Sequence, residues 1–354
     1  MMKVNSRQIL FVTFLLCVLS GGAVQAKKWV PSERKMKAYL FTFFNDATHS
    51  LFMATSHDGY NFRAVNDGKP VIAGDTIALQ KGIRDPHIFR GPDGAFYLSM
   101  TDLHIFGKQK GYRTTTWERS EKYGWGNNRD IILMKSRDLI HWTRSIVCLD
   151  EAFPDEFGEV CCFWAPETTY DPVAKKLMIY FTLRKNPGEL TRCYWAYVDD
   201  NYTHLTSRPK ILFEHKDPKV PVLDADICPM PDGRYLLTYV AQESPAGIRY
   251  MISDSIHSGY RPVVDHQIDT ERRGCEAPNV WKRIGEDKWV VMYDCYGLRP
   301  HNFGFVETTD FKNFKPLGHF NDGVMKAENF SSPKHGSVIQ ITEKEARRLE
   351  RHKF

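Results

Sequence analysis

The 354-residue sequence lacks a strong excess of either charge, because 48 lysines and arginines nearly balance 43 aspartates and glutamates and leave a net charge of +5. It also lacks a block of clustered basic residues, which argues against nucleic acid or a membrane surface as a partner. With 42% hydrophobic and 13% aromatic residues, it does not have the composition of a disordered chain. We therefore expect a folded protein with a large buried core.

Cysteine is scarce, with eight in the chain, and no CxxC pair or histidine at ligand spacing accompanies them. This scatter argues against a zinc site and against a small disulfide scaffold. We expect most of these cysteines to be buried as small hydrophobic side chains. One or two disulfides would suit an oxidising compartment, with Cys161 and Cys162 the first pair to inspect, but the sequence does not give the pairing.

Long apolar runs are also missing, apart from residues 9–19. Lys3 and Arg7 precede this run and small residues follow it up to Ala26, which is the pattern of a signal peptide over residues 1–26. The run is about half of the roughly 20 residues that cross a bilayer, so we expect export to the periplasm or medium and no membrane insertion. Cys17 follows Leu16 rather than a small residue, which argues against a lipid anchor.

After residue 26 the sequence has almost no helical periodicity. Short β-rich runs instead follow turns rich in aspartate, glycine and proline, at residues 96–100, 177–181, 235–239 and 289–293. A second element, a polar turn followed by an aromatic residue, recurs at residues 56–62, 136–142 and 309–314, with a degenerate copy at 253–260. The chain is therefore built from one repeated β unit.

The repeated units begin near Asp85, Glu167, Asp224, Glu276 and His335, at intervals of 82, 57, 52 and 59 residues. Such spacing is typical of propeller blades. The first interval carries an insertion at 104–128, and the fifth unit has one strand at 336–341 whose partners are available at 38–44, 51–56 and 62–65. We predict an all-β, five-bladed β-propeller closed by strands from both termini, forming a single catalytic domain over residues 27–354. The alternatives are a β-sandwich or two β domains, and residues 343–351 are expected to form a short charged helix in a solvated tail.

Each unit begins with an acid or histidine just before residues that favour strands, which core packing alone would not select because buried carboxylates are costly unless paired. Two carboxylic acids across a pocket are the minimum for hydrolysing a glycosidic bond, since one protonates the leaving oxygen and the other activates water or attacks the sugar. A third carboxylate can keep the acid protonated by like-charge repulsion.

Five motifs occur in the order Asp85-Pro86, Trp164-Ala165-Pro166, Asp224, Glu276-Ala277-Pro278 and His335-Gly336. In this order the chain resembles glycoside hydrolase family 43. The members of that family are five-bladed propeller enzymes that act on arabinose-, xylose- and some galactose-containing polysaccharides. The resemblance implies that Asp85 is the general base, Asp224 the acid that tunes the pKa, and Glu276 the general acid of an inverting reaction. The base and acid carboxyls of inverting enzymes lie about 6.5–9.5 Å apart. His335 resembles the family's central-channel histidine, beside which calcium is the ion the family suggests; no cofactor is required for the chemistry.

The chain departs from the family pattern at Asp224-Ala225-Asp226, where alternate residues could both face inward; we favour Asp224 over Asp226 for the tuning role. Glu167 ends the Trp164 motif where the family often has aspartate, and either lines the pocket or makes a structural hydrogen bond. Arg299 either binds substrate or steers a carboxylate. Trp164, Glu167, Asp226, Arg299 and His335 are thus the candidate substrate-binding residues.

Purely structural interpretations stay open for several of these residues. Asp85 could accept hydrogen bonds from turn amides, and Glu276 could be a structural acid paired with Arg84 or Arg299. His87 and His301 are expected to be structural histidines. The aromatic residues of the insertion are candidates for a wall of the sugar pocket: Tyr112, Trp117, Tyr123 and Trp125.

We expect an exported, exo-acting, monomeric glycosidase that removes terminal sugars from plant-type polysaccharide, with α-L-arabinofuranosidase as the first choice from the family's habits. β-D-xylosidase and exo-β-galactosidase are the alternatives within the fold. A non-catalytic carbohydrate-binding propeller is disfavoured because Asp85, Asp224 and Glu276 are all present. A sialidase-like enzyme would need an arginine trio and a tyrosine nucleophile that the sequence does not place.

Overall fold

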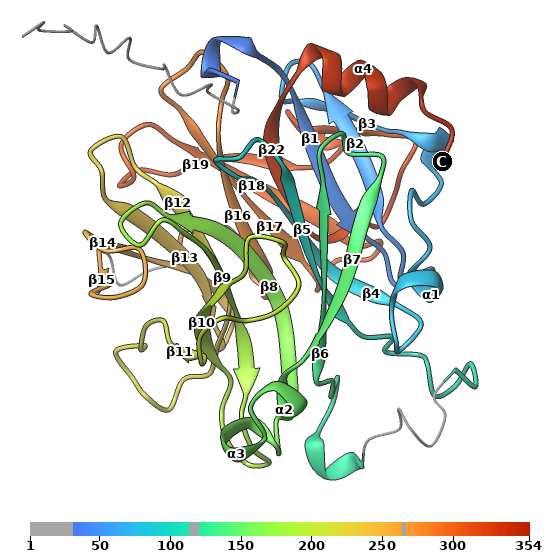
Figure 1. Ribbon diagram of the computed structural model, residues 1–354. Helices are drawn as coiled ribbons and strands as arrows, with labels where there is room; N and C mark the ends of the chain where they lie inside the picture. The colour runs from blue at the N-terminus through green and yellow to red at the C-terminus, as the bar shows by residue number, and fades with distance from the viewer. Residues whose placement is uncertain (1–30, 113–119, 264–266) are drawn as a thin grey trace, which may run out of the picture.

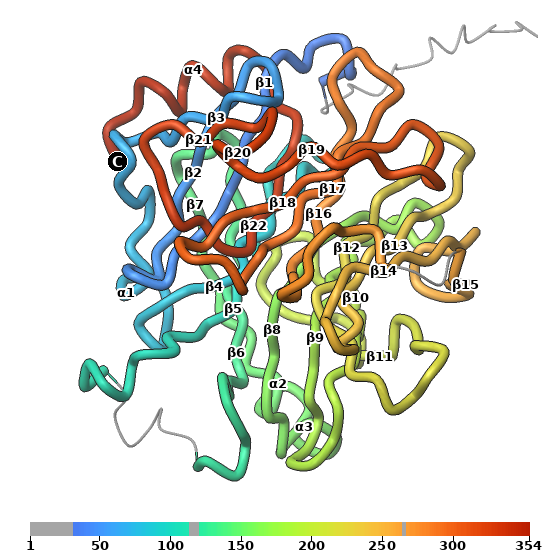
Figure 2. Tube along the Cα trace, turned by 180° about the vertical axis from the view of Figure 1, so that it is seen from behind, coloured from blue at the N-terminus to red at the C-terminus, as the bar shows by residue number. Residues whose placement is uncertain are grey.

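The computed structural model describes residues 31–112, 120–263 and 267–354. Five sheets form a five-bladed β-propeller (Figure 1), which confirms the predicted fold. Viewed from behind, the strands nearest the middle of the ring are those at residues 83–90, 162–171, 222–229, 276–282 and 334–342 (Figure 2). The predicted signal peptide lies outside the described residues. In the described ranges, no helix has the length and apolar character needed to cross a membrane.

Four of the sheets consist of consecutive strands, ordered from the innermost outward. The first holds β4 (Ile83–Arg90), β5 (Phe96–Asp102), β6 (Asp130–Ser136) and β7 (Trp142–Cys148), and the second holds β8 (Cys162–Asp171), β9 (Lys176–Arg184), β10 (Arg192–Val198) and β11 (Lys210–Ile211). The third holds β12 (Val222–Pro229), β13 (Tyr235–Ala241), β14 (Gly247–Ser253) and β15 (Arg261–Pro262). The fourth holds β16 (Glu276–Lys282), β17 (Trp289–Cys295), β18 (Asn302–Thr308), β19 (Lys315–His319) and β20 (Asp322–Gly323).

The fifth sheet joins the two ends of the chain, as predicted. Its order is β22 (Lys334–Thr342), β1 (Met36–Phe44), β2 (Phe52–Ser56), β3 (Asn61–Ala64) and β21 (Lys326–Glu328). β1 and β22 run antiparallel, and their pairing joins the two ends of the chain in one blade and so closes the ring. The short parallel strand β21 was not predicted; the side chain of Asn329 holds it beside β3 by bonding the backbone of Ala64.

The repeated polar turns have the same hydrogen bonds in three blades. The aspartate of each turn accepts two backbone N–H groups, and a serine or threonine two residues earlier accepts a third. In the third copy this hydroxyl belongs to Thr308 rather than Thr309, with which the predicted segment began. Side-chain capping of this kind explains why the motif marks the entry into an outer strand. The aspartates are Asp58, Asp138 and Asp310.

Helices are short and peripheral: η1 (Glu33–Lys35), η2 (Asn66–Gly68), α1 (Gly74–Ile77), η3 (Glu121–Tyr123), α2 (Leu149–Ala152), α3 (Pro154–Phe157) and α4 (Glu343–Arg351). Helix α4 exists as predicted, but the expectation of a solvated tail was wrong. Ala346 and Leu349 are fully buried in the core shared with β1 and β4, and Thr342 and Glu345 form a capping box at its start. Apolar residues three apart give even this charged helix one face that packs.

The described cysteines are all free thiols, and all except the half-buried Cys148 are buried. This confirms their expected role as small hydrophobic side chains. Cys161 and Cys162 are not bridged to each other or to another residue of the described ranges.

Four inner strands carry a β-bulge near their beginning, between Arg84 and His87, Trp164 and Glu167, Leu223 and Asp226, and Glu276 and Asn279. One residue in each bulge has a positive φ of 45–54°, a conformation that is costly for residues other than glycine. Bulges re-aim side chains and are common beside functional sites. The positive-φ residues are Asp85, Ala165, Asp224 and Ala277.

Candidate active site

A pocket of about 490 Å³ lies where the beginnings of the inner strands meet. Asp85 of β4, Asp224 of β12 and Glu276 of β16 all line it, together with Trp164 of β8 and His335 of β22. Each of these side chains comes from a different blade. The ring therefore brings together acids that are up to 191 positions apart in the sequence.

Asp85 is ion-paired with His335, with 3.2 Å between Oδ1 and Nδ1. Its other oxygen accepts the hydroxyl of Thr101 at 2.7 Å. Burial alone would raise the pKa of Asp85, but the charge and hydrogen bond of His335, with Arg84 and Thr101, hold that pKa well below its usual range. Burial lowers the pKa of His335, but Asp85, Asp224 and Glu276 outweigh it and raise the pKa to about 9. Asp85 is thus a carboxylate beside a cationic imidazole at neutral pH.

The side chains around His335 do not form a calcium cage. Calcium is bound mainly by oxygen ligands, whereas His335 offers nitrogen, and its Nδ1 already pairs with Asp85. Within the described ranges, two groups of three side chains have ligand atoms within 4.8 Å of one another, and neither contains His335. We therefore assign no step of the chemistry to calcium.

Glu276 is paired with Lys334, at 3.4 Å between Oε1 and Nζ. The expected structural partners are engaged elsewhere: Arg84 pairs with Asp46 at 2.8 Å, and Arg299 donates to the carbonyls of Tyr296 and Leu298. Sequence reasoning missed Lys334, although it directly precedes His335, because a lysine at the start of a strand carries no signal of its own.

Two further acids lie around this pair, and the pKa of each is raised toward neutral pH. Burial and the charges of Glu276 and Asp85 raise the pKa of Asp224 to about 7, although the charge of His335 acts in the opposite direction. Burial and the charge of Glu276 raise the pKa of Asp294 to about 6, although the charge of Lys334 acts in the opposite direction. Lys334 also contacts Asp294 at 3.4 Å. The side of the pocket near Glu276 therefore differs electrostatically from the side near Asp85.

Asp224 and Asp226 do not both face the pocket, which corrects the expectation from strand alternation. The bulge lies between Leu223 and Asp226 and interrupts the alternation. Asp224 stays at the pocket wall and accepts the Ala277 N–H at 3.2 Å. Asp226 turns toward β16, where it accepts the side-chain amide of Asn279 at 3.2 Å and the Val280 N–H at 2.8 Å.

Glu167 also lies beneath the pocket rather than in its wall. It accepts the Tyr180 hydroxyl at 2.9 Å and lies 3.6 Å from Nε2 of His87. Burial, together with the charge and hydrogen bond of Asp226, raises the pKa of Glu167 far above its usual range. The structure thus favours the structural interpretation of Glu167. His87 accepts the Thr168 N–H at 3.1 Å, which fits its expected structural role.

An aromatic wall borders the pocket. Trp164 donates its indole N–H to the Gly126 carbonyl at 2.8 Å, and the ring of Trp125 meets it edge-on at 6.0 Å. Arg184 lies over Trp164 at 5.9 Å and donates to the Tyr123 carbonyl. Of the four predicted insertion aromatics, Trp125 lines the pocket and Tyr112 packs against His104. Tyr123 takes part through its backbone carbonyl, which accepts the hydrogen bond from Arg184. Trp117 lies outside the described residues.

The pocket wall also includes several basic side chains, among which His301 has a pKa lowered mainly by burial. Arg299 lines the pocket, and so do His301 and Arg184. His301 lies 3.7 Å from Asp46, which pairs with Arg84. Asp46 and Arg184 were not predicted, because a single charged residue in a turn or at the end of a strand carries no periodic signal.

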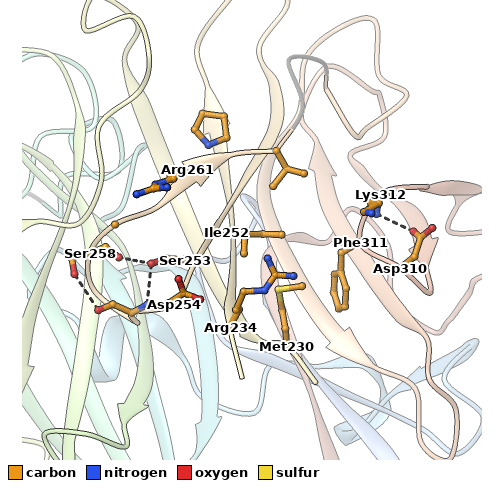
Figure 3. Close-up of a pocket in the computed structure, with 14 residues that line it drawn as sticks. Met230, Arg234, Ile252, Ser253, Asp254, Ser258, Arg261, Asp310, Phe311 and Lys312 are labelled. Atoms are coloured by element: carbon orange, nitrogen blue, oxygen red, sulfur yellow. Dashed lines mark hydrogen bonds between the residues drawn. The ribbon is translucent and has the colours of Figure 1, made fainter. Parts of the chain in front are cut away.

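A second pocket of about 580 Å³ lies between the β12–β13 hairpin and the loop after β18 (Figure 3). Asp310, one of its acids, is used by its own turn, accepting the N–H groups of Lys312 and Asn313. Among the described residues of its wall, Asp254 is the other acid. This pocket therefore lacks the facing acids and the histidine of the pocket at the ring centre.

Residues 34–347 match the family described as "Probable glycosyl hydrolase domain". A curated α-L-arabinofuranosidase from Bifidobacterium longum is 25% identical over 129 residues, which are 36% of this chain and 11% of that protein. The chain thus matches only a small part of that relative's length.

Solved structures share the fold at low sequence identity. A thermostable family-43 glycoside hydrolase has a TM-score of 0.53 at 19% identity, over 72% of this chain and 78% of that chain. The GH43 protein BlXynB from Bacillus licheniformis has a TM-score of 0.55 at 13% identity, over 87% and 55%. A xylan β-1,4-xylosidase from Bacillus halodurans has a TM-score of 0.56 at 12% identity, over 87% and 56%. The chain spans little more than half of the last two proteins.

Proposed function

The chain belongs to the glycosyl hydrolase family related to glycoside hydrolase family 43, and we propose that it releases terminal sugars from plant-type polysaccharide with inversion at the anomeric carbon. Terminal α-L-arabinofuranose is the first-choice sugar. The partial similarity to an α-L-arabinofuranosidase supports this choice. The aromatic wall of Trp125 and Trp164 suits a sugar ring, whose C–H faces pack on aromatic side chains.

Asp85 acts as the general base in this proposal. It is ionised because His335 and Arg84 stabilise its negative charge, and an ionised carboxylate can take a proton from water. His335 acts as a positioning residue, since its ion pair and the Thr101 hydroxyl fix both carboxylate oxygens. The water then attacks the anomeric carbon from the side of Asp85.

Glu276 acts as the general acid and donates its proton to the leaving oxygen. Asp224 makes negative charge on this side of the pocket less favourable, because its charge and that of Glu276 repel each other. Lys334 opposes this effect and anchors the Glu276 side chain. The two roles thus rest on different surroundings for two carboxyls of one pocket, which is the usual way an enzyme separates acid from base.

One observation carries the proposal: acids from three blades line a single pocket, and one of them is ion-paired with a buried histidine. A carbohydrate-binding propeller without catalysis would need neither the ion pair at Asp85 nor the acids of raised pKa around Glu276.

The proposed roles are tested by Glu276→Gln and Asp85→Asn. Each should lower kcat/KM on natural linkages by about 10²–10⁴-fold or more, as loss of a general acid or base does. An aryl glycoside with a good leaving group needs little protonation, so it should restore much of the Glu276→Gln activity and none of the Asp85→Asn activity. Asp254→Asn, in the wall of the second pocket, is the matched control. Near wild-type turnover of natural linkages by Glu276→Gln would contradict its role.

Stereochemistry and substrate are tested separately. NMR of the first product should show an inverted anomeric centre, and a retained centre would contradict the role of Asp85. Aryl α-L-arabinofuranoside, β-D-xyloside and β-D-galactoside should be compared at equal concentration. A higher kcat/KM on the xyloside or galactoside would replace arabinofuranosidase with the corresponding alternative.

We also propose that the protein is exported after cleavage near Lys27, works as a monomer and needs no cofactor for turnover. Mass spectrometry of the protein recovered from the periplasm or medium gives the mature N-terminus. Light scattering gives its mass in solution, and activity after dialysis against a chelator tests the absence of a required metal.

A further inference from the structure

Three side chains with metal-binding atoms meet in the fourth sheet, outside the pocket described above. Oε1 of Glu271 lies 2.8 Å from Nε2 of His319. Sγ of Cys295 completes the group, and these ligand atoms all lie within 4.8 Å of one another. None of the three residues lines the catalytic pocket.

The sheet register explains how Cys295 and His319 meet. His319 of β19 is opposite Gly304 of β18, and Gly304 is opposite Tyr293 of β17. Residues opposite each other lie on the same face of a sheet, and so do residues two apart in a strand. Cys295 is two residues after Tyr293, so it shares a face with His319. Gly304 has no side chain to separate them.

Glu271 comes from the segment that leads into β16, and this segment is fixed in place. Asp269 accepts the Glu271 N–H at 2.9 Å with one oxygen and the Ile248 N–H at 2.7 Å with the other. The segment is therefore tied to β14, and the Glu271 carboxylate is held over the face that carries Cys295 and His319. Three elements thus supply one side chain each to a preformed cluster.

We propose that Glu271, Cys295 and His319 form a zinc site. Thiolate, imidazole and carboxylate are the ligands zinc takes in proteins, and three of them leave a fourth tetrahedral position for water. Cys295 is buried, whereas 24% of the His319 side chain and 10% of the Glu271 side chain are exposed, so an ion and a water can reach the site from that side.

Only small movements are required. Bonds of about 2.0–2.3 Å in a tetrahedron place ligand atoms roughly 3.3–3.8 Å apart. The Glu271 and His319 atoms need to separate by about 0.5–1 Å, which rotation of their side chains allows. On binding, Zn²⁺ replaces the thiol proton of Cys295 and binds neutral imidazole, so the released protons go to solvent.

The site would hold the segment before Glu276 against the strand that carries Asp294, because Cys295 follows Asp294 directly. It does not depend on the proposed glycosidase function, and its test needs no substrate. The competing chemistry to test for is a disulfide between Cys275 and Cys295, which are both buried, free thiols in this structure.

The test uses the full exported protein, from which metal is removed before titration with Co²⁺. Co²⁺ binds in zinc sites, and its absorption spectrum shows which ligands coordinate it. We expect a thiolate-to-cobalt charge-transfer band that saturates at one equivalent and is displaced by Zn²⁺. Cys295→Ser should abolish the band. His319→Ala should leave the fold intact, because His319 is partly exposed. This variant should bind Co²⁺ at least about tenfold more weakly, since even the loss of a residue that only supports a metal ligand lowers metal affinity about tenfold. Cys228→Ser, a buried free thiol elsewhere, should change nothing.

Zn²⁺ should also raise the melting temperature of the wild type and of Cys228→Ser, but not of His319→Ala. Absence of the band, or its persistence in Cys295→Ser, would overturn the proposal. So would thiol titration of the protein as isolated showing that Cys275 and Cys295 are joined as a disulfide.

Discussion

Replacing His335 with glutamine tests whether a cation keeps the catalytic base ionised. Glutamine can still donate a hydrogen bond to Asp85, but it has no charge. An opposite charge within about 4–6 Å lowers a carboxyl pKa by roughly 1–3 units, and the His335–Asp85 pair is closer, at 3.2 Å, and buried. The substitution should therefore raise the pKa of Asp85 by about 1–3 units, which is roughly 1.4–4 kcal/mol.

The direction of the pH effect follows from the role of Asp85. A base works as the ionised form, so kcat/KM falls as the pH drops through its pKa. In wild type this fall should occur at unusually low pH, because the pKa of Asp85 is held well below its usual range. In His335→Gln the acidic limb should move to higher pH by about 1–3 units, while the alkaline limb moves less.

The assay is kcat/KM for an aryl glycoside across the pH range, with circular dichroism at each pH to show that the fold persists. His301→Gln is the matched control, because His301 lines the same pocket but lies beside Asp46 rather than Asp85. Its acidic limb should stay in place. An acidic limb of His335→Gln that coincides with wild type, or that moves to lower pH, would refute the assignment of Asp85 as a base held by His335.

Three further predictions follow from other contacts. Lys334→Met removes the cation 3.4 Å from Glu276, so the alkaline limb of kcat/KM should move to higher pH by about one unit; an unmoved limb would contradict this. Trp164→Ala should raise KM about tenfold, or roughly 1.4 kcal/mol, with a smaller change in kcat, in steady-state kinetics. Leu349→Ala should lower the free energy of unfolding by about 2–5 kcal/mol in urea denaturation, because Leu349 is fully buried under α4, while kcat at low temperature stays near wild type.

The fold was predictable because its signals are local and repeated. Aspartate-rich turns at Asp58, Asp138 and Asp310 mark the same step of three blades by bonding their own backbone. Strand runs and turn residues recur at blade spacing, and the single strand at 336–341, whose missing partners lie near the N-terminus, predicts ring closure. The strand β21 escaped prediction because two long-range hydrogen bonds between the side chain of Asn329 and the backbone of Ala64 hold it in place.

The site was predictable in its acids but not in their partners. Asp85, Asp224 and Glu276 each begin a repeat unit and could be found by their position. Lys334 and Asp46 could not, because their roles depend on which loops the ring brings together. The Glu271–Cys295–His319 cluster was not predicted for the same reason. Cys295 lies 24 residues after Glu271 and His319 lies 24 residues after Cys295, which is much longer than the spacing of local metal-binding motifs, and only the fold brings the three residues together.

The bulges of the inner strands connect the fold to the chemistry. A residue in the left-handed region costs roughly 1–2 kcal/mol unless it is glycine, and three bulges are held by the same kind of bond. The positive-φ residue donates its N–H to a side chain of the preceding blade: Ala165 to Thr101, Asp224 to Thr182, and Ala277 to Asp224. Thr101 also donates to Asp85, and Asp224 is itself in the pocket. In these three cases one blade fixes the bulge of the next, so the shape of this part of the pocket depends on the packing of neighbouring blades in the closed ring.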